Sequence, residues 1–488
     1  MQKQPCIALA MSFFKKTKKK MNKEKPVQSQ HEILEKLLNE ISVVDFRVFL
    51  NLPENENIKQ KHLLVGIIKN LSEVAKANQW SLCKSFDYTY IYNGQYWKQL
   101  DKDDLKDFLG KCAAKMGCPD YDAAHYEFKD KLLKQFLTDC HLSQPVPDEN
   151  KMIINLQNGT FEFENDSWTL RDFDSADFMT YQLPFCYDET ATCPMFNGYL
   201  DKVLPDKESQ MILQEFAGYI FTKLNLEKML MLTGSGQNGK SVFFDIICAL
   251  LGRENVLQYT LGAFSSEYNR AKLTDVLLNY SSEKGTDVNP DTFKALVSGE
   301  PLQAREPYGR SFTLHNTVRF IINANELPSE IELTDAFFRR WIIIPFEVQI
   351  SEEEKDIDLS KKIIANELAG VFNWLLQGLD RIVKNRRFTH SEKVNNAIGE
   401  FKWQSDKVNL FIDEFNYTAS DTNKVHLSDL YKDYKQFCQD DGYKPLGKNK
   451  FSKKLENKKF EKSRASNGSI CFGMASAQSD NIDDFLPF

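Results

Sequence analysis

The sequence predicts an α/β core built around a phosphate-binding loop, with an α+β region before it and a small helical module after it. Two observations support this prediction. Short apolar runs alternate with amphipathic helical stretches over residues 201–383, which is the pattern of strands and helices in a parallel sheet. Within this range, the strand-like Lys228–Thr233 and the apolar helix Ser241–Leu251 enclose Gly234–Ser241, whose sequence GSGQNGKS fits the pattern G-x-x-x-x-G-K-S/T.

Each position of this loop has a chemical role. The glycines allow backbone N–H groups to turn inward around a β-phosphate, Lys240 neutralises the β and γ oxygens, and the Ser241 hydroxyl can hold Mg²⁺. The alternative is a glycine-rich turn before a core helix, which the correct flanking elements disfavour. We therefore expect ATP and Mg²⁺ as cofactors, bound by Gly234, Ser235, Gly236, Gln237, Asn238, Gly239, Lys240 and Ser241.

Composition narrows the class of protein. The chain has 488 residues, 42% of them hydrophobic, and its ten cysteines form no C-x-x-C pair, so neither a disulfide framework nor a zinc site is indicated. No apolar run approaches the ~20 residues that span a bilayer, and we expect a cytoplasmic protein with no membrane partner. The net charge of −7 means that nucleic acid would have to be bound by local basic surfaces.

The residues before the core divide into two parts. Residues 1–30 form a basic tail that we expect to be disordered, because its lysines follow its short apolar run instead of preceding it as in a signal peptide. Residues 31–200 predict an α+β accessory region. Helical spacing over His31–Lys76 and Asp103–Asp139 encloses a β-like stretch, Trp80–Gln99, and a second β-rich patch follows with a turn at Asn158-Gly159.

Polar side chains follow three of the strands predicted downstream of the loop. Glu283 ends a buried strand, where a carboxylate can hold Mg²⁺ through water or orient the attacking water. Asn325 ends a second strand, where an amide could sense the γ-phosphate. Arg339 and Arg340 precede a third strand, and one of them could reach ATP bound to a neighbouring subunit. Taken singly, such residues are more often structural ion pairs.

The order of these motifs resembles the superfamily 3 helicases. It runs from the phosphate loop through a strand-end Glu to F-K-A-L-V-S-G-E, A-R-E-P-Y, N-E-L-P and R-R-W-I-I-I-P-F. Within that superfamily it is similar to the phage and plasmid primase-helicase family of satellite phages and poxviruses, from about Ile154 to the end of the chain. The resemblance implies a P-loop AAA+-like core over residues 201–383.

The resemblance also implies roles for individual residues. Lys240 and Ser241 correspond to the Walker A pair, Glu283 to the Walker B acid and Asn325 to the sensor. Arg340 corresponds to the arginine finger, with Arg339 as the less favoured alternative. Because Ser282 stands where a second acid is usual, Mg²⁺ would be held by Ser241 and Glu283 alone.

A DNA-gripping hairpin is implied by the same resemblance. Family members build it into the central channel of their ring, just before the sensor strand. Tyr308-Gly309-Arg310 would form its turn. Lys294, Arg305 and Arg310 would hold phosphates and Tyr308 would stack on a base.

Relatives in this family carry a primase domain, whose chemistry needs a D-x-D pair with further ligands. Asp101 and Asp103, or Asp120 and Asp122 with His125 nearby, have that spacing. They lie in short helix-like or turn-like stretches, and we interpret them as solvated faces. We expect no primase domain in this chain.

Residues 384–406 predict a polar helical connector, and residues 407–474 predict a winged helix. The latter prediction rests on helices near Val408–Phe415, Leu427–Cys438 and Lys448–Asn457, followed by two strands joined at Ser466-Asn467-Gly468. The third helix would meet DNA phosphates through Lys450, Lys453 and Lys454. The alternative is a solvated lysine-rich face.

Residues 475–488 form an acidic tail that resembles the tip of bacterial single-stranded DNA-binding proteins. Such tips place a terminal Phe and carboxylate in a basic-rimmed pocket of partner proteins. We expect host or element replication proteins to bind here, and the alternative is an untethered acidic tail. The expected contact residues are Asp483, Asp484, Phe485, Pro487 and Phe488.

These features together predict an ATP-dependent DNA helicase that replicates a phage, plasmid or mobile element in the cytoplasm of a bacterial host. It would act on single-stranded and forked DNA as a homo-oligomeric ring, a hexamer moving 3′ to 5′ by family resemblance. Two alternatives remain open: a ring ATPase that remodels or loads replication proteins, and a DNA-binding initiator whose nucleotide only controls assembly.

Overall fold

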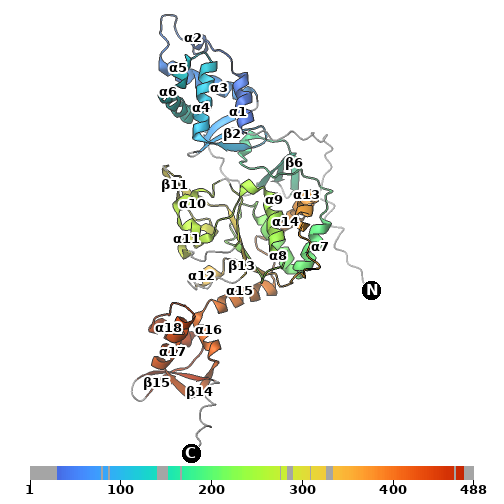
Figure 1. Cartoon of the computed structure of the whole chain (residues 1–488), viewed down its shortest axis with the longest axis vertical. Helices are drawn as coiled ribbons and strands as arrows, with labels where there is room; N and C mark the ends of the chain where they lie inside the picture. The colour runs from blue at the N-terminus through green and yellow to red at the C-terminus, as the bar shows by residue number, and fades with distance from the viewer. Residues whose placement is uncertain are drawn as a thin grey trace, which may run out of the picture.

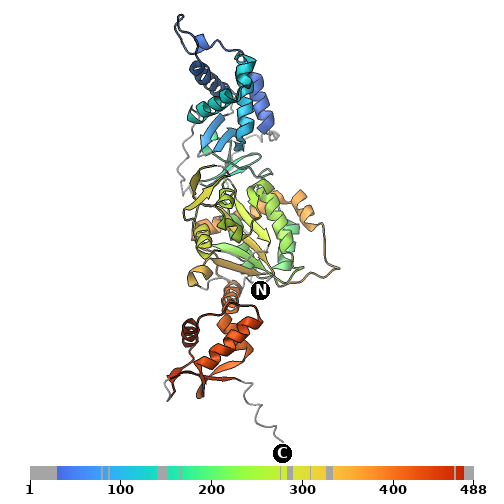
Figure 2. The same cartoon turned by 60° about the vertical axis from the view of Figure 1, so that its left-hand side comes forward.

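The computed structural model describes residues 30–78, 81–85, 88–139, 152–164, 167–274, 276–282, 289–307, 309–325, 334–465 and 469–476. These residues form an elongated molecule with an N-terminal region at one end, a central α/β core, and a C-terminal module at the other end (Figures 1 and 2). Among the described residues, no helix is both long and apolar enough to cross a membrane.

The N-terminal region combines a helical cluster with two small antiparallel sheets. Leu37, Ile67, Leu105 and Phe136 lie in the buried core of the cluster. Its helices are α1 Gln30–Glu40, α2 Phe46–Phe49, α3 Gln60–Ala77, α4 Lys102–Lys115, α5 Asp120–Ala124 and α6 Tyr126–Asp139. The strands are β1 Ser81–Ser85, β2 Tyr88–Tyr92 and β3 Trp97–Leu100 in one sheet, and β4 Met152–Leu156, β5 Gly159–Glu164 and β6 Ser167–Arg171 in the other.

The two sheets are held together by hydrogen bonds between side chain and backbone. The Trp97 Nε1–H donates to the Ser175 carbonyl at 2.8 Å, and the Asn155 amide donates to the Gln95 carbonyl at 2.8 Å. Trp97 packs with Phe178 in a small aromatic cluster. The first sheet therefore docks on the segment that leads into the core.

The core is a five-stranded parallel sheet in the order β13-β7-β12-β9-β8. This confirms the predicted α/β class with a parallel sheet. Its strands are β7 Met229–Thr233, β8 Val256–Leu257, β9 Leu278–Ser282, β12 Arg319–Ala324 and β13 Trp341–Pro345.

Helices cover both faces of this sheet, because successive side chains of a strand point to opposite faces. Leu230 and Leu232 belong to one buried cluster, whereas Met229 and Met231 belong to the other. The first face carries α7 Pro194–Val203, α8 Lys207–Tyr219, α9 Lys240–Leu251, α13 Leu359–Asn366 and α14 Leu368–Asn385. The second carries α10 Glu267–Ala271, α11 Pro290–Ser298, α12 Asp335–Phe338 and α15 Glu392–Gln404, with a hairpin of β10 Leu302–Arg305 and β11 Ser311–Leu314.

Residues 384–406 are more than the polar connector that we expected. Their main element is α15, which packs on β13. Phe401 is fully buried, with its ring 5.4 Å from that of Phe338 and 5.9 Å from that of Trp341. Aromatic packing of this kind is not visible in the polar composition of the segment.

The C-terminal module contains the three predicted helices and the predicted hairpin. It also contains a strand that we did not predict, β14, which pairs with β16 and completes a sheet in the order β14-β16-β15. The elements are α16 Lys407–Glu414, β14 Tyr417–His426, α17 Leu427–Asp440, α18 Lys448–Asn457, β15 Lys462–Arg464 and β16 Ile470–Ser476. The remaining turns of helix among the described residues are the 3₁₀ segments Ser175–Asp177, Arg253–Asn255 and Leu261–Ser265.

Candidate functional site

The glycine-rich loop lies between the end of β7 and the start of α9, at the carboxyl edge of the sheet between β13 and β12. Gly239 is the N-cap of α9 with φ of 84°, a left-handed conformation that favours glycine. Gly252, with φ of 85°, ends the helix. Strand, loop and helix therefore follow one another as the sequence predicts.

Lys240 and Asn238 form the polar interior of the loop. The Lys240 Nζ lies 2.6 Å from the Gly234 carbonyl oxygen and 3.1 Å from Asn238 Oδ1. The buried Asn238 in turn donates to the Phe346 carbonyl at 3.0 Å. The ammonium group is thus held inside the ring of backbone that would surround a phosphate, whereas Ser241 is exposed at the first turn of α9.

Two positions of the loop require glycine because neighbouring atoms lie too close for a Cβ. A Cβ on Gly234 would lie 1.9 Å from Asn238 Nδ2 and 2.4 Å from the Phe346 oxygen. A Cβ on Gly239 would lie 2.8 Å from Val203 of α7. The Tyr199 hydroxyl of the same helix donates to the Gly239 carbonyl at 2.8 Å, so α7 supports the loop from behind.

The segment after β13 runs along the loop and binds it at three points. The Ile350 N–H donates to the Gln237 carbonyl at 2.9 Å. The Gln237 amide donates to Glu352 Oε1 at 2.9 Å, and the Gln349 amide donates to Ser235 Oγ at 3.0 Å. These contacts fix the loop from outside, and sequence patterns did not predict them.

The neighbouring strand ends bring polar groups beside the loop. β12 pairs with β7 as far as Ala324 and Thr233, so Asn325 follows directly at this edge, where it is exposed. Asn323 also belongs to this edge, since its Oδ1 accepts a hydrogen bond from the Tyr280 hydroxyl at 3.0 Å. We did not predict a role for Asn323, although it lies two residues before Asn325, at the carboxyl end of β12.

Tyr280 links this amide to the loop helix. Its ring packs edge-on against Phe244 of α9 at 4.7 Å, and burial raises the pKa of its hydroxyl well above the usual range. The hydroxyl therefore stays protonated and donates to Asn323. Glu283 lies outside the described residues; the strand that precedes it ends at Ser282, whose register partner is Asn323.

The two arginines lie at the opposite edge of the sheet, next to the start of β13. Arg340 is buried, with 6% of its side chain exposed, and its guanidinium donates twice to Ser298 Oγ, at 2.7 and 3.1 Å. Arg339 is 62% exposed. Glu227 contacts both, with its Oε2 3.0 Å from Arg339 NH2 and 3.3 Å from Arg340 NH2.

This placement argues against our expectation that Arg340 is the arginine finger. A guanidinium that is buried and bonded inside its own subunit cannot extend to another one without breaking these contacts. Arg339 is exposed and its only side-chain bond among the described residues, to Glu227 at 3.0 Å, lies at the surface, so it has the outward position that the role requires. The sequence could not separate the two, since they are adjacent and identical.

A hairpin is present where the sequence predicts one, formed by β10 and β11, which pair from Leu302 with Leu314 to Arg305 with Ser311. Its contact with DNA stays a prediction. Arg305 is bonded to the turn, with its Nε–H donating to the Gly309 carbonyl at 3.1 Å, and its NH1 lies 3.8 Å from Glu267 Oε1. Arg310 is exposed, and Tyr308 lies outside the described residues. Lys294 is not on the hairpin but on α11, 3.6 Å from Asp291.

The lysines of α18 divide into two groups. Lys450 and Lys453 are exposed on its outer face. Lys454 instead lies 2.7 Å from Asp406, the residue that caps α16, and Lys458 lies 3.7 Å from the same carboxylate. Lys454 is therefore occupied inside the protein, contrary to our expectation that it faces DNA.

Three stretches of the chain match known protein families. Residues 70–205 match the D5 N-terminal-like family, and residues 403–485 match the poxvirus D5-protein-like family. Residues 232–340, from the loop to the arginine pair, match a family of unknown function, DUF5906. Two viral proteins named as candidate helicases are similar over 333 residues, 59% of this chain. One is from Invertebrate iridescent virus 3 at 23% identity, the other from Acanthamoeba polyphaga mimivirus at 24%.

These matches support a relationship of the chain to D5-type superfamily 3 helicases. The alignments cover only 35% and 33% of the two viral relatives, so this chain corresponds to about a third of their length. Among solved structures, the apo C-terminal region of NrS-1 is similar at 15% identity, with TM-scores of 0.47 and 0.48. The match covers 83% and 82% of this chain and 98% of the other.

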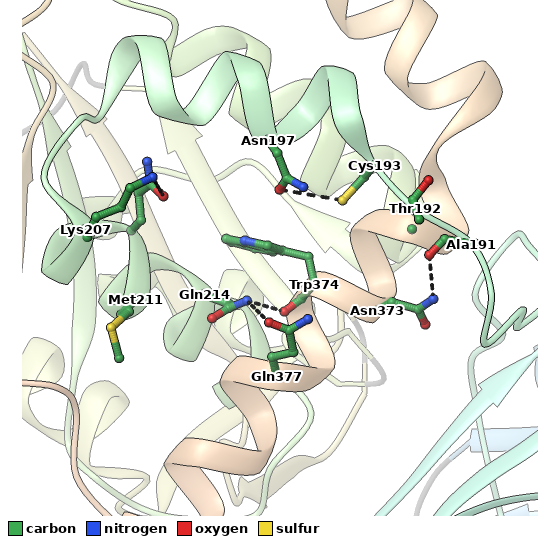
Figure 3. Close-up of a pocket in the computed structure, with 12 residues that line it drawn as sticks. Ala191, Thr192, Cys193, Asn197, Lys207, Met211, Gln214, Asn373, Trp374 and Gln377 are labelled. Atoms are coloured by element: carbon green, nitrogen blue, oxygen red, sulfur yellow. Dashed lines mark hydrogen bonds between the residues drawn. The ribbon is translucent and has the colours of Figure 1, made fainter. Parts of the chain in front are cut away.

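A pocket of about 500 Å³ lies between α7, α8 and α14 (Figure 3). Asn197 lines it from the side of α7 that faces away from Tyr199 and the phosphate loop. Two other amide side chains that line the pocket form hydrogen bonds within the fold. Gln214 donates to the Trp374 carbonyl at 2.6 Å, and Asn373 donates to the Ala191 carbonyl at 2.9 Å. We therefore place it outside the nucleotide site.

The remaining predicted site residues lie in the N-terminal region and in the C-terminal tail. Asp101 caps α4 by accepting from the backbone of Asp103 and Asp104, and Asp120 and Asp122 lie exposed in the short α5. Among the described residues, no three His, Cys, Asp or Glu side chains gather as a metal site. The tail residues Asp483, Asp484, Phe485, Pro487 and Phe488 lie outside the described residues.

Proposed function

We propose that this protein is an ATP- and Mg²⁺-dependent DNA helicase that acts in the replication of a phage, plasmid or other mobile element. One observation carries the proposal. The phosphate loop lies at the carboxyl edge of the sheet, while the exposed Arg339 lies at the amino edge. An arginine there cannot serve its own loop, so a complete ATP site needs a second copy of the chain.

The arrangement of the sheet supports an AAA+-like core. The loop strand β7 lies between β13 and β12, and the strand that leads to Glu283 lies beyond β12. The ends of β12 and of the strand that leads to Glu283 therefore lie on the same side of the loop, and each is followed by a polar residue. This is where a water-orienting acid and a phosphate-sensing amide are needed.

The residues of the loop would act as follows. Lys240 would leave the Gly234 carbonyl to bind the β and γ oxygens of ATP. Ser241 and Glu283 would hold Mg²⁺, which bridges those oxygens and neutralises their charge. Asn325, aided by Asn323, would contact the γ-phosphate, and Arg339 of the neighbouring subunit would stabilise the charge that develops on it.

DNA would be gripped at two places. In a ring, the β10–β11 hairpin would present Arg310 and Tyr308 to a single strand, with Arg305 bracing the turn and Lys294 adding positive charge from α11. The C-terminal module has the helix and strand order of a winged helix. Lys450 and Lys453 would contact phosphates of duplex or forked DNA.

The ring size, direction and partners are proposed on family grounds. A hexamer moving 3′ to 5′ follows from the family resemblance, as does action in the cytoplasm of a bacterial host. Binding of host or element replication proteins by Asp483–Phe488 is proposed from the sequence of the tail alone.

The test is ATP turnover measured with and without single-stranded DNA. We expect stimulation by DNA in the wild type, loss of turnover in Lys240→Ala and Arg339→Ala, and loss of stimulation alone in Arg310→Ala. Lys134→Ala, a substitution of an exposed lysine on α6 in the N-terminal region, serves as the matched control.

Two outcomes would overturn the proposal. Turnover that ignores DNA and Arg310 but needs Lys240 would favour a ring ATPase that remodels or loads proteins. Very slow turnover with DNA binding intact would favour an initiator whose nucleotide controls assembly.

A further inference from the structure

A second pocket, of about 630 Å³, opens at the amino edge of the sheet, between the start of β13, α8 and the loop from α14 to α15. Its floor is apolar and includes Ile212, Trp341, Val394 and Ile398. Its rim carries Lys228, Arg386, Arg387 and His390. None of the described residues that line it is a carboxylate, so the pocket combines an apolar interior with a positive rim.

The rim charges are arranged to face outward. Arg386 ends α14 in a left-handed conformation, with φ of 50°, and both Arg386 and Arg387 are exposed. Neither guanidinium has an ion pair with another described residue. Lys228 donates to the Arg339 carbonyl, which connects the pocket to the arginine proposed to act on a neighbour.

An acidic segment with an exposed apolar residue follows β13 at the carboxyl edge of the same sheet. After β13, residues 351–358 read SEEEKDID, and the run contains five carboxylates and one lysine. Ile357 in their midst is 79% exposed, one of the most exposed large apolar side chains among the described residues. Figure 2 shows this segment standing out from the core before α13.

The segment is anchored at the phosphate loop, because Glu352 accepts from Gln237 at 2.9 Å. Five residues of strand, about 16 Å, separate this edge from the edge that holds the pocket. A subunit therefore presents the segment on one side and the pocket on another. Two different surfaces that fit each other produce head-to-tail contacts, which close into rings.

We propose that residues 352–358 of one subunit dock into this pocket of its neighbour, with Ile357 on the apolar floor and the exposed Glu353 facing Arg386 and Arg387. Asp356, which lies 2.7 Å from Lys362 of its own subunit, would exchange that partly exposed ion pair for one with these arginines. The occupant is a second copy of this chain, and the proposal rests on the ring assembly of the proposed function. Because the segment touches the phosphate loop and the pocket adjoins Arg339, docking would bring the arginine of one subunit to the loop of the next.

The test uses two charge-reversed variants of the full chain, Arg386→Glu/Arg387→Glu and Glu353→Arg/Asp356→Arg. Sedimentation velocity with Mg²⁺ and a non-hydrolysable ATP analogue reports assembly, and ATP turnover is measured against protein concentration. We expect each variant alone to need at least about 10-fold more protein for half-maximal assembly and turnover, the effect of roughly 1.4 kcal/mol. An equimolar mixture should restore both, since alternating subunits again pair opposite charges.

Two controls complete the design. Ile357→Ser should weaken assembly without changing charge, and Lys432→Glu/Lys435→Glu, a reversal of two exposed lysines on α17, should assemble like the wild type. Wild-type assembly by the Arg386/Arg387 variant, or failure of the mixture to recover, would overturn the docking. Neither result would contradict the proposed ATPase function. That function would be contradicted if Lys240→Ala retained ATP turnover.

Discussion

At positions 339 and 340, two identical side chains have opposite environments. Arg340 donates to Ser298 and to the Ala336 carbonyl and is almost fully buried, whereas the Arg339 side chain is exposed and donates to Glu227 at the rim of the core. A buried guanidinium stabilises the fold, and an exposed one is available to a partner. The pair therefore divides into a structural and a functional arginine.

Substitution should separate these roles. Arg339→Ala should leave the melting temperature unchanged and lower ATP turnover by about 10³-fold or more, the usual effect of losing an arginine finger. Arg340→Ala should destabilise the core by about 3 kcal/mol, because it leaves buried partners unsatisfied. Thermal unfolding and turnover of both variants check this, and a stable but inactive Arg340→Ala would contradict it.

Substitutions of Asn325 and Asn323 should likewise distinguish an effect on activity from an effect on stability. Asn325→Ala and Asn323→Ala should both lower turnover with little change in ATP binding, since each is proposed to act on the γ-phosphate. Asn323→Ala should also lower stability, by about 1 kcal/mol, because it removes the partner of the buried Tyr280 hydroxyl. Binding of a fluorescent ATP analogue, turnover and unfolding together check this prediction.

At the scale of elements, α8 and α14 approach each other closely through two glycines. A Cβ on Gly218 would lie 2.5 Å from the Leu379 nitrogen, and a Cβ on Gly378 would lie 2.2 Å from the Gln214 oxygen. Both obstacles are backbone atoms, which cannot move aside as a side chain can. The close packing of these helices therefore depends on glycine at both positions.

Gly378→Ala should force the two helices apart and lower stability by roughly 1–3 kcal/mol, the range for overpacking. Gly399→Ala is the matched control, because a Cβ at this position of α15 would meet no other atom within 4 Å. It should stabilise the protein by about 1 kcal/mol through helix propensity. Urea unfolding followed by circular dichroism measures both, and equal effects would contradict the packing argument.

The helix α18 offers a comparison within one element. Lys450→Ala/Lys453→Ala should weaken duplex DNA binding and reduce the slope of log affinity against log salt by about 0.9 for each phosphate that is no longer neutralised. Lys454→Ala should keep that slope but lower stability by about 1 kcal/mol, since it removes the partly exposed ion pair with Asp406. Fluorescence anisotropy over a salt series distinguishes the two.

At the scale of the whole molecule, α15 joins the C-terminal module to the arginine-bearing edge of the core. Phe401 and Lys402 contact Phe338 and Asp335 on the core side. The next residue, Trp403, donates to Asp413 of the module at 2.8 Å. Three consecutive residues thus touch both parts.

Trp403→Ala should uncouple the two parts. We expect basal ATP turnover and duplex affinity to stay as in the wild type, while stimulation of turnover by duplex DNA is abolished. Trp403→Phe should retain less than full stimulation, since the indole N–H bond to Asp413 is absent. Unchanged stimulation in Trp403→Ala would mean that α15 carries no coupling.

The sequence by itself determined the parallel α/β core, the loop and most of the helices and strands. These depend on signals between near neighbours, such as apolar periodicity, capping residues and the fixed spacing of GSGQNGKS. It also carried the family relationship, because the order of the motifs is itself a linear feature.

Only the tertiary structure decided which of several similar residues is available for function. Arg340 is buried by Ser298, which lies 42 positions earlier, and Lys454 is engaged by Asp406, 48 positions earlier. β14 and α15 likewise acquire their roles from partners distant in the chain. The burial and pairing of a side chain depend on contacts between residues distant in sequence. A local sequence pattern does not indicate which distant residue will contact it.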